Sequence, residues 1–279
     1  MNDKKIRFTV PNFVNEIIFR DIENFDIKIN SFFNRLFTSS YTNVDKYPFK
    51  KSSGNKKIQF NLNKENQLIY DNIIPKNKIQ NESEYFRDLI RTYISQPHYK
   101  RERKIFQFEY ESIEKSIQRK EEVLITHLEE DYVVEPYFFK VTPEEKNNFL
   151  FCWIYEKKEY NVFNLSRISK VTPIKFRKNK RHLDLDYIDK VHKKFDPFLS
   201  YGNIVKVRLT DQGKNWFKRI SHYKPTLIKI EGDIYFCESS DKKAIIYFSR
   251  FYNEAEILEP LSLRNKIKIL LEDTLSKYN

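Results

Sequence analysis

The sequence predicts an α+β fold made of three successive regions, at residues 1–96, 97–200 and 201–279. Three observations lead to this prediction. A strand-helix-helix unit occurs twice in the first region, and closely spaced strands follow a short helix in the second. The third region reads as strand, helix, two strands, helix and strand.

Composition limits the classes of partner and compartment. Lys and Arg number 51 against 39 Asp and Glu, a net charge of +12, so we expect a polyanion as partner, with nucleic acid first. Cys152 and Cys237 are too few for a disulfide framework or a cysteine zinc site, which fits a reducing cytoplasm. No apolar run approaches the roughly 18 residues of a membrane-spanning helix. We therefore expect a cytoplasmic protein with no membrane partner and no cofactor.

The repeat in the first region contains three elements in the same order. Residues 4–10 (KKIRFTV) recur as 56–62 (KKIQFNL), 16–19 (EIIF) as 67–70 (QLIY), and 32–37 (FFNRLF) as 85–90 (YFRDLI). Both strands alternate apolar and polar residues, so each has one core face and one polar face. We expect Asn30 and Ser83 to be the N-caps of the second helices.

This order resembles the ribbon-helix-helix DNA-binding fold, in which two paired strands enter the major groove. Members usually obtain the second strand from another chain, whereas these tandem copies would supply both. The resemblance implies that the solvent face of the ribbon reads base edges and that helix N-termini near Asn30 and Ser83 hold phosphates. The alternative is a merely solvated face. The candidate residues are Lys5, Arg7, Thr9, Lys57, Gln59 and Asn61.

The second region predicts a helix over residues 112–120 and strands over 123–127, 131–141, 148–155 and 159–171. Closely spaced strands after a short helix are typical of a small, strongly bent antiparallel β-barrel or sandwich, and we expect the barrel.

The landmarks of this region resemble the WYL domain of bacterial regulators, which has an Sm-like barrel. Residues 134–137 (VEPY) look like its V-x-P strand start, and 163–168 (FNLSRI) match its F-x-L-D/S-R-I segment. Residues 148–151 (NFLF) lie where Trp-Tyr-Leu is expected, so Asn148 and Phe149 depart from the family pattern.

The WYL resemblance implies a basic pocket for a nucleotide or a single-stranded nucleic acid, and it places Arg167 in that pocket. A guanidinium suits bidentate contact with phosphate or stacking on a base. The alternative is a structural ion pair. Thr126 and His127 are expected to line the same pocket, and the basic run that includes Lys175, Arg177 and Lys178 is expected to follow a phosphate backbone or to be a solvated loop.

The third region has a ferredoxin-like order of elements, with strands over 204–209, 226–230, 233–237 and 255–258, and helices over 211–220, 241–251 and 261–278. Residues 257–264 (ILEPLSLR) resemble the C-terminal extension that follows WYL domains, which implies a homodimer. Lys206 and Arg208 share one strand face and are candidate ligand contacts or ordinary exposed cations.

Sequence patterns for catalysis are scarce. The chain has no Walker A, dinucleotide-binding, zincin or nucleophile-elbow motif. Asp184, Asp186 and Asp189 alternate with apolar residues as a helix requires, so we expect no metal site. Two Arg-His spacings, 91–98 and 177–182, match the loose pattern of HEPN ribonucleases, but the all-helical context of that fold is missing. We expect no enzymatic activity.

Two functions remain open from the sequence. The first is a regulator that joins a ribbon-helix-helix reader of duplex DNA to a WYL sensor of a nucleotide or single strand. The second is an accessory protein that binds single-stranded RNA and modulates an RNA-guided ribonuclease, because similar WYL proteins accompany some type VI-D CRISPR loci. Its partners would then include a CRISPR effector.

Overall fold

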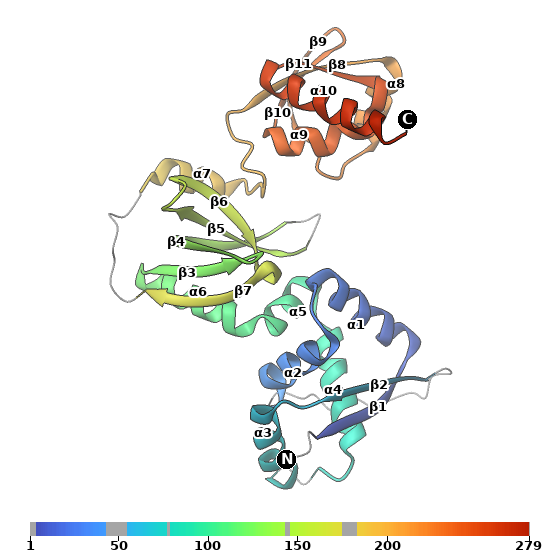
Figure 1. Cartoon of the computed structure of the whole chain (residues 1–279), viewed down its shortest axis with the longest axis vertical. Helices are drawn as coiled ribbons and strands as arrows, with labels where there is room; N and C mark the ends of the chain where they lie inside the picture. The colour runs from blue at the N-terminus through green and yellow to red at the C-terminus, as the bar shows by residue number, and fades with distance from the viewer. Residues whose placement is uncertain (1–3, 43–54, 77–78, 143–145, 175–182, 279) are drawn as a thin grey trace. The chain divides into compact units, whose positions relative to one another are not determined.

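The structure is a computed structural model that describes residues 4–42, 55–76, 79–142, 146–174 and 183–278. It contains helices and antiparallel sheets, so the α+β class is confirmed (Figure 1). The chain divides into two compact units. Unit 1 comprises Met1–Val141 and Glu145–Leu183, and unit 2 comprises Asp184–Asn279 with Thr142–Glu144.

Unit 1 begins with a two-stranded antiparallel ribbon of β1 (Lys5–Pro11) and β2 (Asn55–Asn61). The register places Arg7 opposite Gln59 near the middle of the ribbon. The alternation of the sequence decides which face is buried. The apolar side chains that point inward from the two strands, and from the residue after β2, are Ile6, Phe8, Val10, Ile58, Phe60 and Leu62, all at most 4% exposed.

Each ribbon strand is followed by two helices. They are α1 (Asn12–Phe25), α2 (Ile29–Ser40), α3 (Lys64–Lys76) and α4 (Glu82–Ile94). The core between them and the ribbon is aromatic: Phe33 stacks on Phe60 with centroids 4.8 Å apart, and Phe8 stacks on Phe86 at 5.9 Å. Because both repeat copies contribute rings to one core, neither copy is a separate folding unit.

The predicted N-caps are wrong by two residues in both second helices. Asn81 caps α4, where its side chain accepts a hydrogen bond from the Glu84 amide. Lys28 precedes α2 and makes no side-chain cap. Ser83 instead donates its hydroxyl to the Arg7 carbonyl oxygen at 3.1 Å, so it ties α4 to the ribbon.

The rest of unit 1 is α5 (His98–Ile105), α6 (Gln107–Arg119) and one five-stranded antiparallel sheet. Its strands are β3 (Glu122–His127), β4 (Glu130–Val141), β5 (Asn148–Ile154), β6 (Glu159–Asn164) and β7 (Ile168–Ile174), in the order β6-β5-β4-β3-β7. Ile113 of α6 belongs to the core cluster of this sheet.

The described strands do not form the closed barrel that we predicted. The single strand expected over 159–171 is interrupted by the 3-10 turn η1 (Leu165–Arg167), where the Asn164 side chain accepts from the Ser166 amide at 3.1 Å. This turn separates β6 from β7, which lie at opposite edges of the sheet. Among the described strands the sheet is therefore open.

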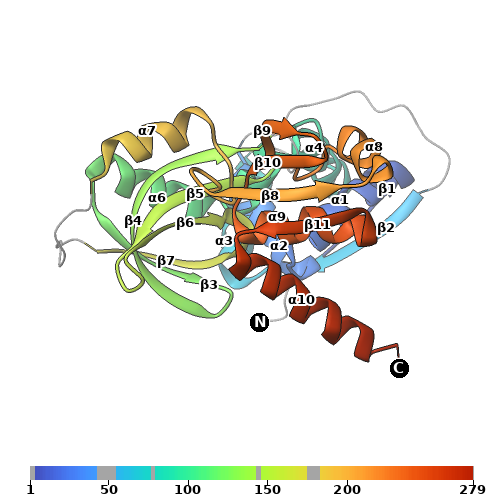
Figure 2. The same ribbon diagram turned by 90° about the horizontal axis from the view of Figure 1, so that it is seen from above.

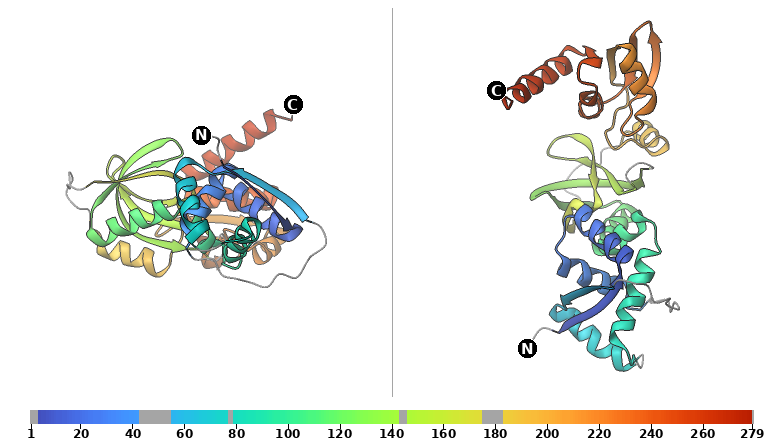
Figure 3. Two further views of the ribbon diagram at one scale, coloured as in Figure 1. Left: turned by 90° about the horizontal axis from the view of Figure 1, so that it is seen from below. Right: turned by 90° about the vertical axis from the view of Figure 1, so that its right-hand side faces the viewer.

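Unit 2 contains α7 (Leu185–Lys193), α8 (Asp211–Arg219), α9 (Asp241–Phe248), the 3-10 segment η2 (Ser249–Glu254) and α10 (Leu261–Ser276). Its antiparallel sheet has the order β11-β8-β10-β9, from β8 (Ile204–Leu209), β9 (Thr226–Glu231), β10 (Ile234–Glu238) and β11 (Ala255–Glu259). The C-terminal part of α10 projects away from this sheet (Figures 2 and 3).

Candidate nucleic-acid interface

The solvent face of the ribbon brings all six predicted polar residues together. The register pairs Lys5 with Asn61, Arg7 with Gln59, and Thr9 with Lys57, and all six side chains are exposed. The Arg7 Nε atom donates to Gln59 Oε1 at 3.0 Å, which orients both side chains in the middle of the face. The arrangement presents hydrogen-bond donors and acceptors along both strands.

The charge on this face is positive. Lys5, Arg7 and Lys57 supply three cations, and the other three members are neutral. A nearby carboxylate, Glu82, is paired with Lys4 at 3.0 Å. The face therefore favours contact with a polyanion.

A buried amide network, which was not predicted from the sequence, holds the ribbon on α2 and α3. Asn34 donates to the Asn61 carbonyl oxygen at 2.9 Å and accepts from the Asn63 amide at 2.8 Å. Asn66, 1% exposed, donates to the Asn34 carbonyl oxygen at 2.9 Å. An amide within the apolar run 32–37 was the available signal, because a polar residue among phenylalanines needs a specific partner.

The two helix N-termini proposed for phosphate contact differ in charge. The first turn of α2 has no acidic residue, whereas that of α4 contains Glu82 and Glu84. Glu84 is paired with Arg87 and Arg91, at 2.6 and 3.2 Å. Because carboxylates already occupy the positive end of α4, the α2 terminus is the better place for a phosphate.

Arg167 lies at the end of η1 and forms an ion pair with the first region. Its Nη1 atom is 2.7 Å from Asp26 Oδ2, and the two side chains are 34% and 77% exposed. Asp26 is the left-handed C-cap of α1. The ion-pair alternative therefore describes Arg167 in this structure, and its role in ligand binding stays a prediction.

Of the other residues predicted for the basic pocket around Arg167, the structure describes two, and three lie outside the described residues. Thr126 donates to Asp131 Oδ1 at 2.5 Å, and the His127 ring packs on Phe163 with centroids 4.7 Å apart. The register of β3 with β7 places His127 opposite Ile168, next to Arg167. Lys175, Arg177 and Lys178 lie outside the described residues.

Lys206 and Arg208 lie on β8 of unit 2, and acidic residues of β11 pair with both. Lys206 Nζ is 2.6 Å from Glu259, and Arg208 Nη1 is 2.8 Å from Glu256. Arg264 also contacts Glu256 at 2.7 Å, and these two guanidinium groups lower the pKa of Glu256 through hydrogen bonding and charge. An anion at Arg208 would have to compete with an established carboxylate.

A buried ionic cluster joins α1, α4 and α5. Asp21 is fully buried and accepts from Arg101 Nε and Nη2 at 2.7 and 2.9 Å and from the Tyr93 hydroxyl at 2.7 Å. Burial, reinforced by the Asp21 charge, raises the pKa of Tyr93, so its hydroxyl stays protonated and donates. These contacts span about 70 to 80 residues of sequence, and the local sequence pattern gave no signal for them.

Glu102 connects α5 to the sheet. Its fully buried carboxylate accepts from the Asn148 amide and side chain, each at 2.6 Å, and from the Ser166 amide at 3.2 Å. Burial raises the pKa of Glu102 to about 7, and these hydrogen bonds oppose the shift. Asn148, a departure from the WYL pattern, thus has a structural role here.

The described residues contain neither a group of side chains that could bind a metal ion nor a helix that could span a membrane. In that part of the chain no three His, Cys, Asp or Glu side chains are grouped so that they could hold a metal ion. Asp184 instead caps α7 by accepting from the Tyr187 amide. None of the described helices has the length and apolar character needed to cross a bilayer.

Comparison with known proteins gives matches among solved structures. No protein-family model and no curated protein matches the chain. A crystal structure described as a CRISPR Cas-related protein is 16% identical, with a TM-score of 0.70 over 100% of this chain and 95% of that one. Proteasome accessory factor B/C of Arthrobacter aurescens is 16% identical, with a TM-score of 0.31 over 62% of this chain and 27% of that one. The chain thus shares its overall fold with a CRISPR Cas-related protein.

Proposed function

We propose that this protein is a non-enzymatic nucleic-acid-binding regulator in which a tandem ribbon-helix-helix region reads duplex DNA. The observation that carries the proposal is the solvent face of β1 and β2, with three cations and three neutral polar residues in cross-strand register. A two-stranded ribbon fits the major groove, where Arg, Gln and Asn side chains can distinguish base pairs. The cations add affinity through the phosphates.

The pseudo-symmetry of the repeat supports this proposal. Arg7 and Gln59 occupy equivalent positions in the two copies and face each other across the ribbon. Each strand is followed by two helices, and the four helices and both strands share one aromatic core. One chain would therefore supply the complete reader that ribbon-helix-helix proteins usually assemble from two.

We also propose that the five-stranded sheet acts as a WYL-like module that binds a nucleotide or single strand through Arg167, near Thr126 and His127. The pair with Asp26 is compatible with that role, because an exposed ion pair contributes only about 0–1 kcal/mol. A phosphate could therefore displace Asp26 from Arg167. Such an exchange would change a contact between the sheet and α1, and so link the ligand to the reader.

For unit 2 we propose a ferredoxin-like extension that forms a homodimer. The strand order β11-β8-β10-β9 and the two crossover helices support the fold assignment. Exposed apolar residues on α10 support the dimer, because such a surface favours association. They are Leu261, Ile269, Leu270, Leu271 and Leu275. Sedimentation of Leu271→Glu/Leu275→Glu beside the unmodified chain tests this, and an unchanged mass would contradict it.

A second candidate function is that of a CRISPR accessory protein which binds single-stranded RNA and modulates an RNA-guided ribonuclease. The structural neighbour described as CRISPR Cas-related favours it. The decisive assay adds the protein to a type VI-D CRISPR ribonuclease and measures target-RNA cleavage. A changed cleavage rate supports this function, and no change supports the duplex-binding regulator.

The primary experiment compares duplex DNA, single-stranded DNA and single-stranded RNA at one salt concentration, by fluorescence anisotropy. The duplex should be one that the protein itself selects from a random pool, since a reader of bases prefers particular sequences. Failure to select any duplex would contradict the first proposal. Incubation of the protein with labelled RNA, with and without divalent metal, tests the non-enzymatic assignment, which RNA cleavage would contradict.

A further inference from the structure

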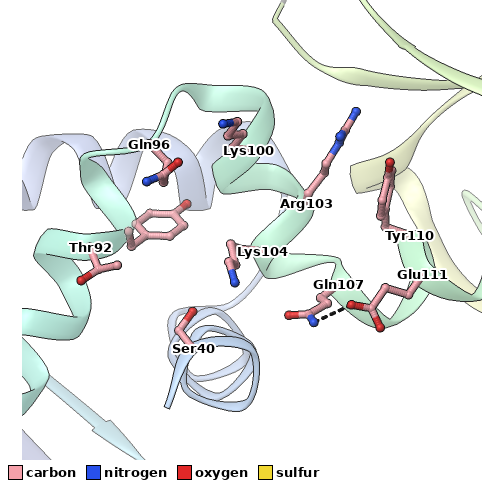
Figure 4. A pocket seen from close by; sticks show the side chains of 10 residues that line it. Ser40, Thr92, Gln96, Lys100, Arg103, Lys104, Gln107, Tyr110 and Glu111 are labelled. Atoms are coloured by element: carbon pink, nitrogen blue, oxygen red, sulfur yellow. Dashed lines mark hydrogen bonds between the residues drawn. The ribbon is translucent and has the colours of Figure 1, made fainter. Parts of the chain in front are cut away.

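A pocket of about 440 Å³ lies in unit 1 (Figure 4), and neither Arg167 nor any residue of the ribbon face lines it. Its lining comes from the end of α2 and from α4, α5 and α6. From α4 to α6 the lining positions recur every three or four residues, at 92–93, 96, 100, 103–104, 107 and 110–111, and Gln96 lies in the connection between α4 and α5. This spacing places one side of three successive helices around a single hollow.

The lining of this pocket is cationic. Lys100, Arg103 and Lys104 leave α5 in different directions around the hollow, and Glu111 is the acidic member of the lining (Figure 4). Glu111 accepts from Gln107 Nε2 at 2.6 Å. Among the described residues no ion pair is formed by Lys100 or Lys104, and the Lys104 ammonium donates to the Ser39 carbonyl oxygen at 3.4 Å. Two ammonium groups are therefore available to an anion.

Arg103 and Tyr110 give the pocket a rigid side. Arg103 Nε donates to Asn148 Oδ1 at 2.6 Å, and its guanidinium lies 4.6 Å from the centroid of the Tyr110 ring. Gln96 adds an amide at the opposite end of the lining. The pocket thus combines fixed polar groups with the apolar surfaces of tyrosine rings and lysine stems, as small-molecule sites do.

We propose that this pocket binds an organic phosphate of the size of a mononucleotide. Lys100 and Lys104 would hold the phosphate, because ammonium groups bind it as point charges with several donors. The volume exceeds what a phosphate ion needs and falls within the range of about 300–1,000 Å³ for small-molecule sites, so the organic part would occupy the side lined by Tyr110 and Arg103. This site is independent of the ribbon and of Arg167.

Calorimetric titration of the full chain with adenosine monophosphate, adenosine and inorganic phosphate tests the assignment. We expect adenosine monophosphate to bind at least tenfold more tightly than either of the other two, because only this probe has both parts. The variant Lys100→Gln/Lys104→Gln should reduce that affinity at least tenfold. Lys115→Gln removes an exposed cation from α6 outside the pocket and should leave it unchanged.

Three results would overturn the proposal. These are no detectable binding of adenosine monophosphate up to about 10 mM, equal affinity for inorganic phosphate, and equal affinity in the Lys100→Gln/Lys104→Gln variant. The three lysines do not belong to the apolar core, so melting temperatures should stay close to that of the unmodified chain. If the double variant unfolds, Lys100→Glu and Lys104→Glu are titrated singly, and unchanged affinity in both overturns the proposal.

Discussion

Two aspartates near the C-terminal end of α1 show how burial determines the contribution of an ion pair to the stability of the fold. Asp21 is fully buried against Arg101, whereas Asp26 is 77% exposed beside Arg167. Removal of the Asp21 charge leaves a guanidinium without its counter-charge in a low-dielectric site. The same change at Asp26 leaves both partners in contact with water.

We expect Asp21→Asn to lower the free energy of unfolding by about 3–5 kcal/mol. Asp26→Asn is the matched control and should change it by less than about 1 kcal/mol, because asparagine also tolerates the left-handed conformation at this position. Urea unfolding followed by circular dichroism measures both. Similar losses in the two variants would contradict the assignment of Asp21 as the central acceptor of the buried cluster.

Arg167 and Asp26 provide a functional test of the proposed WYL-like site. Arg167→Ala should weaken single-strand binding by about 1–3 kcal/mol, and Arg167→Lys should restore part of it, because lysine keeps the charge but not the planar fork. Asp26→Asn should strengthen binding, since it frees the guanidinium. If Arg167→Ala binds normally but melts at a lower temperature, Arg167 has only the ion-pair role.

The buried carboxyl of Glu102 predicts a dependence of stability on pH. Burial raises its pKa from 4.5 to about 7, so the folded chain binds the proton more tightly than the unfolded chain does. This stabilisation is complete below pH 4.5 and is lost as the pH rises through 7. Glu102→Gln should therefore make the free energy of unfolding depend less on pH between about pH 5 and 8. Parallel profiles for the variant and the unmodified chain would contradict this.

At the scale of elements, the ribbon is the feature whose chemistry is most open to test. Arg7→Ala/Gln59→Ala should reduce affinity for the selected duplex by about 1–3 kcal/mol for each lost base contact and leave single-strand binding intact. Arg20→Ala/Gln118→Ala removes the same residue types from exposed helix positions and serves as the control. An equal loss of affinity for duplex and for single strand would reject the model in which the two ligands bind at separate sites.

Helices and strands with a clear period of apolar residues could be predicted from the sequence, whereas the residues at which they begin and end could not. The strand over 204–209 agrees with β8 because its alternation is visible locally, and the strand over 123–127 agrees with β3 because it is a short run rich in β-branched residues. The break between β6 and β7 was missed, because residues 159–171 are apolar enough to read as one strand. What interrupts them is the Asn164 side chain, which satisfies the Ser166 amide within the turn.

In the candidate site too, features with a local sequence pattern could be predicted, and contacts between distant segments could not. The exposed face of the ribbon followed from alternation plus the repeat, so all six residues were correctly placed on it, and their role in binding stays a prediction. Contacts between distant segments had no such signal: Asp21 meets Arg101, Glu102 meets Asn148, and Arg167 meets Asp26 across 80, 46 and 141 residues of sequence. Their positions depend on tertiary packing, which a local period does not encode.

At the scale of the whole molecule, the two units should unfold separately. The aromatic core of the ribbon region includes Ile105, Phe106 and Leu165, so it extends beyond residue 96 into the segment that leads to the sheet. A fragment of residues 1–183 should therefore fold without unit 2 and give one cooperative transition, whereas the full chain gives two. Calorimetry measures both. A fragment without a cooperative transition would contradict the independence of unit 1.

The antiparallel pairing of β1 with β2 inside one polypeptide has a consequence for the sequences that the reader could select. A ribbon shared by two identical chains is symmetric, so its target must be palindromic and the ribbon is lost on dilution. Here Arg7 is opposite Gln59 and Lys5 is opposite Asn61, so the two halves present different groups. Under the proposed function each half can evolve its preference alone, and a single chain at any dilution can recognise an asymmetric operator.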